Sequence, residues 1–426
     1  MLGEKLISRK LSNGLECGLI PRVDFVKKFA VIAAKFGSID NKFISPRTGE
    51  KVMLPAGVAH FLEHKMFDKK WGSVFDRFSS LGANANAFTS HTVTAYHFTC
   101  TNNFWESLEL LLETVGSIYL TRENVRKEVG IIQQEIMMYC DSPEWRLATN
   151  LLEGLYHRHP VRLDTAGTVE SVSKITKKML LECFKDFYSP ANMMLAVAGA
   201  IEPEEFFERC EGFTRRRRPL KPPELLTFSE PDTVKARETV YGMKVNMPKV
   251  LMGFKECKPA RGGERLVRQS LEADLLLSMI FGKSSPVYLR FYESGVIDES
   301  FSASYVSDRG FGYSALGGDA ASPERFVNEC LKAIERMRKK GVSKRDFSRT
   351  KKRLLGAYLR RFNSLEASAV RAISGRFLKH NPFKVLEVLD SITLKDMNRR
   401  MSEHLREESM SISIVQPVSG DSGKSA

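Results

Sequence analysis

The chain lacks the features that usually mark a secreted or membrane-bound protein. Its seven cysteines are scattered, odd in number and without a C-x-x-C pair, which argues against a disulfide framework and against a cysteine metal site. No apolar run is long enough to cross a bilayer. The first residues also lack the basic and then apolar pattern of a signal peptide. We therefore expect a cytoplasmic protein without a membrane span.

Acidic residues are fewer than basic ones, 51 against 65, so the formal net charge is +14. Such a surplus is compatible with nucleic-acid binding. The charge is dispersed, however, and its densest run, Arg215–Arg218, lies in a proline-rich connector without a nucleic-acid-binding motif. We interpret it as a solvated surface and expect no nucleic-acid partner. Attraction of acidic peptides is the alternative.

The length and the order of the segments predict two α+β units. A chain of 426 residues exceeds a typical single domain, and 42% hydrophobic residues can form substantial cores. The segment Ile175–Phe184, followed by the apolar run 195–198, is echoed by Ile392–Met401, followed by the apolar run 412–415. This repetition indicates one duplicated unit.

The predicted boundaries follow from this repetition and from a stretch rich in arginine and proline. We expect a catalytic unit at 1–210, a basic proline-rich linker at 211–232, and a second unit without a metal site at 233–417. The Ser/Gly-rich residues 418–426 are expected to be a disordered tail.

Histidine is scarce, with eight residues in the chain, yet two fall in one pentapeptide, His60-Phe-Leu-Glu63-His64. Positions i, i+3 and i+4 share one face of a helix, here expected at about 56–67. Both imidazoles can therefore bind one metal ion, with Glu63 beside it to take a proton from water. Zn²⁺ suits these ligands, although cobalt or manganese could occupy them. The other interpretation is a pair of ordinary histidines on an amphipathic helix.

A second helix, predicted at 123–139, carries Glu128 and Glu135 seven residues apart and thus on one face. Such a pair is usually solvated, but the apolar neighbours Val129, Ile131 and Ile132 indicate extensive contact. The metal site needs a third ligand, and Glu135 can supply it. Glu128 could then support the site by orienting a histidine or Glu135 itself.

Residues 83–100 alternate in polarity and predict a strand. The segment 38–55, which lies before the motif helix, is expected to be a loop. The first half of the strand, Asn84–Thr89, is small and polar. It could be an open edge to which an extended peptide adds a strand, or the ordinary start of an internal strand. The pattern does not decide between the two.

These motifs together resemble the pitrilysin family of inverzincin metallopeptidases, which includes insulysin and the mitochondrial processing peptidase. The resemblance covers nearly the whole chain and is strongest to the bacterial YmfH-type branch of single-length chains. The residues that carry it are Asn13-Gly14-Leu15, Gly37-Ser38, Gly57-x-Ala-His-Phe-Leu-Glu-His64, Asn86-Ala-Phe-Thr89, Glu128-x6-Glu135, His159-Pro160, Gly167-Thr-Val-Glu170 and Phe187-Tyr-Ser-Pro-Ala-Asn192.

The resemblance implies a role for each matching residue. His60, His64 and Glu135 would bind zinc, Glu63 would be the general base, and Glu128 would support the site. The edge strand Asn86, Ala87, Phe88 and Thr89 would pair with a bound peptide. The family fold implies two duplicated α/β units related by pseudo-symmetry, each a mixed sheet with helices packed on one side.

The resemblance also implies a closed chamber with two duplicated halves on each side. A chain of this length supplies one side, so a second chain would complete a dimer and admit only small or unfolded peptides. The implied function is that of a zinc-dependent endopeptidase.

One departure from the family pattern concerns an Arg, with a Tyr seven residues later, that contacts substrate and the developing oxyanion. Counting back from Gly295, the Arg position falls on Phe291; Arg290 is one residue away, and no Tyr follows at the required distance. We therefore expect a homodimer to be weakly active or inactive, and a related subunit to supply the missing Arg and Tyr. The alternative is a non-catalytic or only partner-activated structural subunit.

Overall fold

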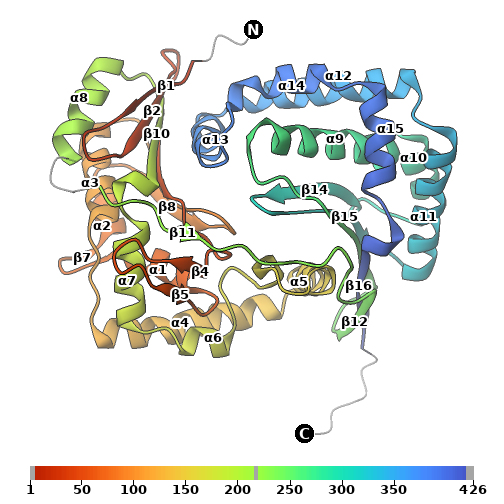
Figure 1. Ribbon diagram of the computed structural model, residues 1–426, viewed down its shortest axis with the longest axis horizontal. Helices are drawn as coiled ribbons and strands as arrows, with labels where there is room; N and C mark the ends of the chain where they lie inside the picture. The colour runs from red at the N-terminus through yellow and green to blue at the C-terminus, as the bar shows by residue number, and fades with distance from the viewer. Residues whose placement is uncertain (1–4, 215–218, 419–426) are drawn as a thin grey trace, which may run out of the picture. The chain divides into compact units, whose positions relative to one another are not determined.

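The structure is a computed structural model that describes residues 5–214 and 219–418. The basic run Arg215–Arg218 and residues 419–426 of the expected tail lie outside this description. The chain divides into two compact units, each made of separate segments (Figure 1). Unit 1 comprises Met1–Met137, Asp164–Thr227 and Leu359–Phe383; unit 2 comprises Met138–Leu163, Phe228–Tyr358 and Lys384–Ala426.

Unit 1 is built on a six-stranded sheet in the order β1-β2-β10-β3-β9-β8. Strand β10 is parallel to β2 and antiparallel to β3, and the other pairs are antiparallel, so the sheet is mixed. The strands are β1 (Ile7–Lys10), β2 (Glu16–Pro21), β3 (Lys28–Ala34), β8 (Asn84–Thr89), β9 (Thr94–Cys100) and β10 (Met193–Gly199).

Unit 2 repeats this arrangement in a five-stranded sheet of order β12-β16-β13-β15-β14. In unit 1 the last strand in the sequence, β10, lies between β2 and β3, and in unit 2 the last strand, β16, lies between β12 and β13. Each of these last strands is parallel to its first-named neighbour and antiparallel to its second. The strands are β12 (Glu238–Met243), β13 (Lys249–Lys255), β14 (Ser302–Asp308), β15 (Phe311–Asp319) and β16 (Met410–Pro417). The predicted duplication and the α+β class are therefore confirmed.

The helix before this last strand has the same construction in both units. Helix α7 (Lys177–Phe187) precedes β10, and α15 (Leu394–Glu403) precedes β16. Each begins after a threonine whose hydroxyl accepts a backbone N–H of the first turn, Thr176 from Met179 and Thr393 from Asp396. Such caps contribute about 1 kcal/mol of helix stability. The Ile-Thr repeat in the sequence thus marks two equivalent helix starts.

Among the described residues, each unit contains one complete α-helix from the opposite half of the sequence. Helix α13 (Leu365–Phe377) belongs to unit 1, where its buried Ala369 and Ile373 pack on the sheet. Helix α5 (Pro143–Leu155) belongs to unit 2 and packs on β13 and β16. A Cβ at Gly154 of α5 would lie 2.3 Å from Oγ of Ser411, so glycine allows this approach without a shift of the serine hydroxyl. Each compact unit is therefore made of separate sequence segments, whereas each predicted unit is one continuous stretch of sequence.

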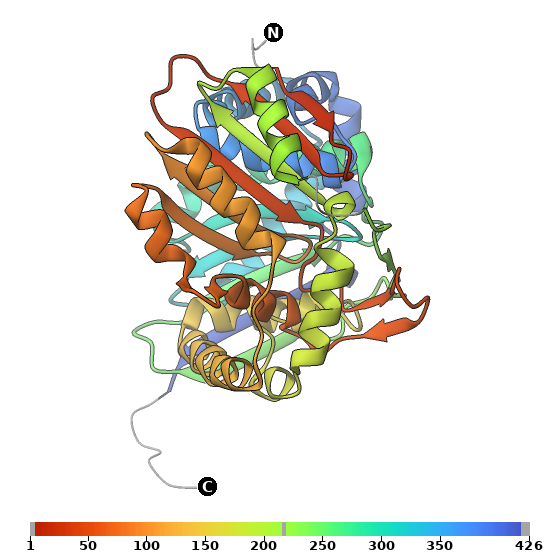
Figure 2. The same ribbon diagram turned by 90° about the vertical axis from the view of Figure 1, so that its left-hand side faces the viewer.

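Helices cover both faces of the sheet in unit 1, whereas the resemblance implied helices on one side, because α13 from the other half of the sequence covers the second face. Val31 of β3 faces the cluster around α13, whereas its neighbour Ile32 lines a pocket with Leu112 and Val115 of α3 (Phe104–Gly116). Alternate residues of a strand point to opposite faces, so α3 and α13 lie on different sides. Figure 2 shows α3 and α8 (Pro203–Thr214) over their shared face of the sheet.

The remaining elements are shorter strands and the helices that complete each unit. The segment expected as a loop, 38–55, contains a small hairpin. Its strands are β4 (Lys42–Ile44) and β5 (Lys51–Met53). Further elements are β6 (Asp68–Lys69), β7 (Gly72–Ser73), β11 (Glu224–Leu225), α2 (Val74–Ser80), α6 (Val169–Ser173), α9 (Gly263–Phe281), α10 (Pro286–Glu293), α11 (Pro323–Lys340), α12 (Lys344–Arg361), α14 (Val385–Ser391) and the short 3-10 helices Pro160–Arg162, Pro190–Asn192, Pro382–Lys384 and Glu407–Ser409.

The single strand expected at 83–100 is instead the hairpin of β8 and β9. The Ser90 N–H donates to the Val93 carbonyl over 2.8 Å, and the Ser90 hydroxyl accepts the N–H of Val93. The polar alternation continues through this serine-closed turn, so periodicity alone did not reveal it. Strand β8 lies at the edge of the sheet, in agreement with the first of the two interpretations of Asn84–Thr89.

Within the two described ranges, no helix combines the length and the apolar character that crossing a membrane requires.

Candidate metal centre

The pentapeptide lies on helix α1 (Val58–Met66), a little shorter than predicted. Gly57 precedes the helix with φ of 92°, and a Cβ there would lie 2.4 Å from the Ala166 carbonyl oxygen, so the start requires glycine. One side of the helix is buried through mainly apolar side chains: Val58, Ala59, Phe61, Leu62, Lys65 and Met66. His60, Glu63 and His64 are only partly buried.

Three side chains from two helices converge at one point of unit 1. One donor atom each from His60, His64 and Glu135 lies within 4.8 Å of the others. Nε2 of His60 is 3.7 Å from one Glu135 oxygen, and Nε2 of His64 is 3.6 Å from the other. Ligands bound tetrahedrally to zinc at about 2.1 Å lie roughly 3.4 Å apart, so this donor set fits a zinc ion with little adjustment.

Helix α4 (Arg122–Cys140) supplies both glutamates. Its buried side chains are Val125, Glu128, Ile132 and Ile136, spaced as one helical face. Ile131, which the sequence suggested as an apolar contact, is 43% exposed. Glu128 therefore lies within the buried stripe, and Glu135, two turns later, faces the histidines.

Glu128 contacts the ring of His64 on the side away from Glu135. Oε1 of Glu128 lies 3.0 Å from Nδ1 of His64, and its Oε2 accepts from Nζ of Lys65 over 3.2 Å. Burial alone would raise the pKa of Glu128, but the bond with His64 and the Lys65 ammonium lower it below its usual value. Glu128 is thus an ionised acceptor that directs Nε2 of His64 toward Glu135.

The histidine rings have opposite electrostatic environments. Burial, and then the charge of His64, lowers the pKa of His60, which favours the neutral form that binds metals. For His64, burial lowers the pKa, but Glu128 and Glu135 outweigh it and raise the pKa above its ordinary value. The two rings lie 4.5 Å apart between centroids.

Glu63 has a partner that the sequence did not indicate. The Thr89 hydroxyl donates to Oε2 of Glu63 over 2.5 Å, and Thr89 also lies 3.5 Å from the hydroxyl of Thr94. Burial raises the pKa of Glu63, and the bond from Thr89 acts in the opposite direction. Thr89, expected only as part of the peptide-binding edge, thus contacts the candidate base. The alternating polarity of β8 was the signal in the sequence for this side chain, but it does not indicate which helix Thr89 would contact.

The edge strand presents main-chain groups to solvent. In antiparallel ladders, bonded and non-bonded pairs alternate, and counting from Ser90–Val93 makes Ala87–Tyr96 a non-bonded pair. The Ala87 N–H therefore points away from β9, and it donates to Oδ1 of the neighbouring Asn86 over 2.8 Å. Phe88 is 38% exposed.

Arg290 is not part of this group. It lies on α10 in unit 2, is exposed, and has its guanidinium 5.4 Å from the Phe291 ring centroid. Phe291, at the position where the family pattern has Arg, is 1% exposed in the core of unit 2. Helix α9, which follows β13 as α1 follows β3, contains no histidine.

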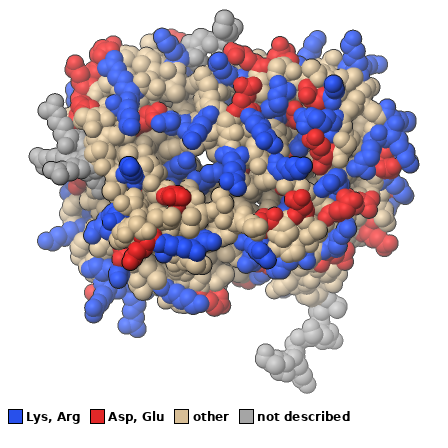
Figure 3. All heavy atoms as spheres, in the orientation of Figure 1, with Lys and Arg blue, Asp and Glu red and all other residues tan. Residues whose placement is uncertain are grey.

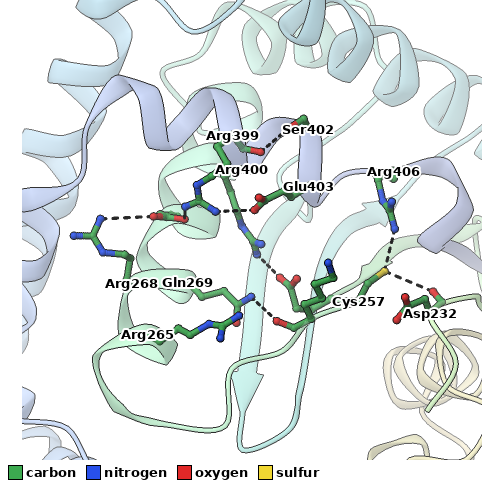
Figure 4. A pocket seen from close by; sticks show the side chains of 13 residues that line it. Asp232, Cys257, Arg265, Arg268, Gln269, Arg399, Arg400, Ser402, Glu403 and Arg406 are labelled. Atoms are coloured by element: carbon green, nitrogen blue, oxygen red, sulfur yellow. Dashed lines mark hydrogen bonds and ion pairs between the residues drawn. The ribbon is translucent and has the colours of Figure 1, made fainter. Parts of the chain in front are cut away.

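Unit 2 has a separate pocket of about 530 Å³ with charged walls (Figure 4). Arg399 donates to Glu403 and to Glu272, both over 2.7 Å, and Arg406 donates to the Cys257 sulfur over 3.3 Å. No histidine lines the pocket. On the face drawn in Figure 3, the acidic and basic side chains of the described residues are interspersed.

Comparison with known proteins places the chain in a family. A family described as Insulinase (Peptidase family M16) matches residues 54–169, and the Peptidase M16 inactive domain matches residues 174–354. The uncharacterized zinc protease YmfH of Bacillus subtilis is 40% identical over 98% of this chain and 98% of that protein. The chain belongs to peptidase family M16, and the expected resemblance to pitrilysin-family proteins is confirmed.

Solved structures agree with this assignment. An M16-like peptidase from Alicyclobacillus acidocaldarius has a TM-score of 0.95 at 36% identity, covering 98% of this chain and 99% of that one. A protease from Helicobacter pylori has a TM-score of 0.84 at 21% identity, which supports the fold. The predicted cofactor, Zn²⁺, agrees with both the family and the His-His-Glu donor set.

Proposed function

We propose that this protein is a zinc-dependent endopeptidase that cleaves extended peptides or unfolded segments. The observation that carries the proposal is the convergence of His60, His64 and Glu135, with Glu63 on the same helix as the histidines. Relatives that are named zinc proteases support it. His60 and His64 would bind the metal through Nε2, and Glu135 through its carboxylate. Bound zinc supplies Lewis acidity, which polarises a scissile carbonyl and lowers the pKa of a water molecule.

Glu63 is the proposed general base. Its Oε2 accepts the Thr89 hydroxyl, which leaves Oε1 to take a proton from the attacking water. The same carboxyl group then donates that proton to the nitrogen of the departing amine. Partial burial favours this exchange, because it brings the carboxyl pKa closer to neutrality.

The proposed peptide site is the free edge of β8. An extended peptide would form main-chain hydrogen bonds with the edge formed by Asn86, Ala87 and Phe88. The Ala87 N–H, which points away from β9, would exchange its bond to the Asn86 side chain for one to a peptide carbonyl. Binding by main-chain groups does not require one particular peptide sequence, and folded substrates would not present such a strand.

We further propose that a second chain completes the site. This chain covers 45% of pitrilysin, at a TM-score of 0.76, and thus corresponds to about half of that longer protein. Because Phe291 is buried at the expected Arg position, the Arg and Tyr would come from a related subunit across a closed chamber. A homodimer would then turn over slowly.

The decisive experiment replaces Glu63 by Gln in the full-length chain, assayed with its partner if one is required. We expect E63Q to bind zinc as the wild type does and to lose at least about 100-fold in peptide hydrolysis, the usual contribution of a general base. Glu123→Gln, an exposed change on α4, is the matched control. Unchanged hydrolysis by E63Q would refute the assigned role.

A non-catalytic subunit is the competing proposal, favoured by the buried Phe291. Metal analysis and peptide hydrolysis by the purified chain separate the two. Stoichiometric zinc with weak hydrolysis that a related subunit increases supports the incomplete peptidase. Full turnover by the chain alone would refute the need for a related subunit, and a protein purified without zinc that binds none on addition would favour the non-catalytic one.

A further inference from the structure

Lys65 is a buried cation on an otherwise apolar side of α1. It is 1% exposed, and Phe61 and Leu62, one turn earlier, are completely buried. A lysine in such a position is costly to desolvate unless its ammonium is paired. An apolar side chain would satisfy the packing alone, so the charge calls for an explanation of its own.

The Lys65 ammonium joins three segments of unit 1. It forms an ion pair with Asp68 of β6 and donates to Oε2 of Glu128 on α4 over 3.2 Å. The side chain of Asp68 is 50% exposed, whereas that of Glu128 is 11% exposed. Solvent can stabilise the Asp68 carboxylate, but Glu128 depends more on its protein partners. The contact with Glu128 is therefore the one that orders the interior.

The two oxygens of Glu128 have different partners. Oε1 contacts Nδ1 of His64 at 3.0 Å, and Oε2 contacts Lys65. A carboxylate held at one oxygen can rotate about its last torsion, whereas one held at both is fixed in orientation. With Glu128 fixed as acceptor at Nδ1, the proton of a neutral His64 stays on that nitrogen and Nε2 carries the lone pair. That Nε2 lies 3.6 Å from Glu135.

The geometry points to Lys65 as a positioning residue for the metal centre: it fixes Glu128, which in turn orients His64. This inference rests on the proposed function, because it assumes that His60, His64 and Glu135 bind the metal. Lys65 also anchors α4 to α1 at Glu128, two turns before Glu135 on the same helix. Its ammonium thus influences two of the three ligands without contacting the metal.

The first test is the zinc dissociation constant of the full-length protein, measured by competition with a chromophoric chelator. We expect Lys65→Met to weaken zinc binding 10- to 100-fold, the usual effect of losing a partner that orients a ligand. Lys69→Met is the matched control. Lys69 is also buried, but it donates to the carbonyls of Thr114 and Ser117, at 2.7 and 2.5 Å. Equal affinity in K65M and wild type, or equal losses in K65M and K69M, would overturn the inference.

A double-mutant cycle separates positioning from a general role in folding. If Lys65 acts through Glu128, then K65M in a Glu128→Gln background should change zinc affinity by less than about twofold, since interacting residues are non-additive. Independent effects that multiply would overturn the inference. If K65M alone does not fold, the comparison of E128Q with the double variant still decides. The double variant lacks both charges of the Lys65–Glu128 contact, so it leaves no buried charge unpaired there. Wild-type protein that binds no zinc would refute the proposed function itself, whereas zinc binding insensitive to K65M would refute only the role of Lys65.

Discussion

The hydroxyl of Thr89 donates a hydrogen bond to Oε2 of Glu63 across 2.5 Å. Thr89 is the last residue of β8, the edge strand proposed to bind peptide, and Glu63 is the proposed base on α1. One strand would therefore hold the substrate and orient the group that activates water. The position of the base would follow the position of the bound peptide backbone.

This relationship predicts the effect of Thr89→Val, which keeps the shape of the side chain but removes the hydroxyl. A hydrogen bond to a charged group contributes about 1.5–3 kcal/mol, so we expect kcat to fall roughly 10- to 100-fold. KM should change little, because β8 retains its main chain. Steady-state kinetics check this, with Thr89→Ser as the control that keeps the donor. A loss confined to KM would contradict the orienting role.

Removal of a proposed ligand should remove the metal. We expect His60→Ala and Glu135→Ala each to weaken zinc affinity by more than about 100-fold, since loss of outer partners alone costs 10- to 100-fold. Metal content after dialysis against a weak chelator measures this. His157→Ala, which removes a histidine of unit 2, should retain the zinc of the wild type. Full zinc content in either ligand variant would exclude that residue from the site.

The edge of β8 can be tested by deleting one N–H. Ala87→Pro removes the donor that points away from β9, and proline is tolerated at edge strands for this reason. We expect KM for peptides to rise about tenfold, the equivalent of one main-chain hydrogen bond. Ala87→Ser keeps the N–H and serves as control. Unaltered KM and kcat in a folded A87P protein would show that peptides do not bind at this edge.

Stability at low pH should depend on His404, which is completely buried in unit 2. Its Nε2 lies 2.6 Å from the Ser314 hydroxyl, and its Nδ1 lies 3.5 Å from Glu256, which is already paired with Arg400. Burial lowers the pKa of His404 well below its ordinary value, and the charge of Arg400 acts in the same direction. The folded protein therefore keeps this ring neutral.

The sign of the pH effect follows from this depressed pKa. Below about pH 6.5 the unfolded chain takes up a proton at His404 that the folded chain does not, so stability falls as the pH falls. The contribution is at most about 1.4 kcal/mol per pH unit. Denaturant unfolding of unit 2 between pH 7 and 5 should show a smaller decline in His404→Gln than in the wild type, with the partly exposed His157→Gln as control. Parallel declines in wild type and H404Q would exclude His404 as the source.

The sequence by itself determined the features that depend on local periodicity. His60, Glu63 and His64 share a helical face because of their spacing, and Glu128 and Glu135 do so for the same reason. The duplication could also be predicted, because the helix and strand that end each unit repeat in order. These relationships hold within one element or between equivalent ones, so residue order is sufficient.

Only the tertiary structure decided which elements meet. An amphipathic helix does not specify which sheet will cover its apolar face, so the exchange of α5 and α13 between the two halves could not be predicted. The same holds for Thr89 beside Glu63 and for Lys65 beside Glu128, residues 26 and 63 positions apart. Their side chains pair because packing removes them from water. Each buried polar group then bonds to the partner that the neighbouring element places beside it.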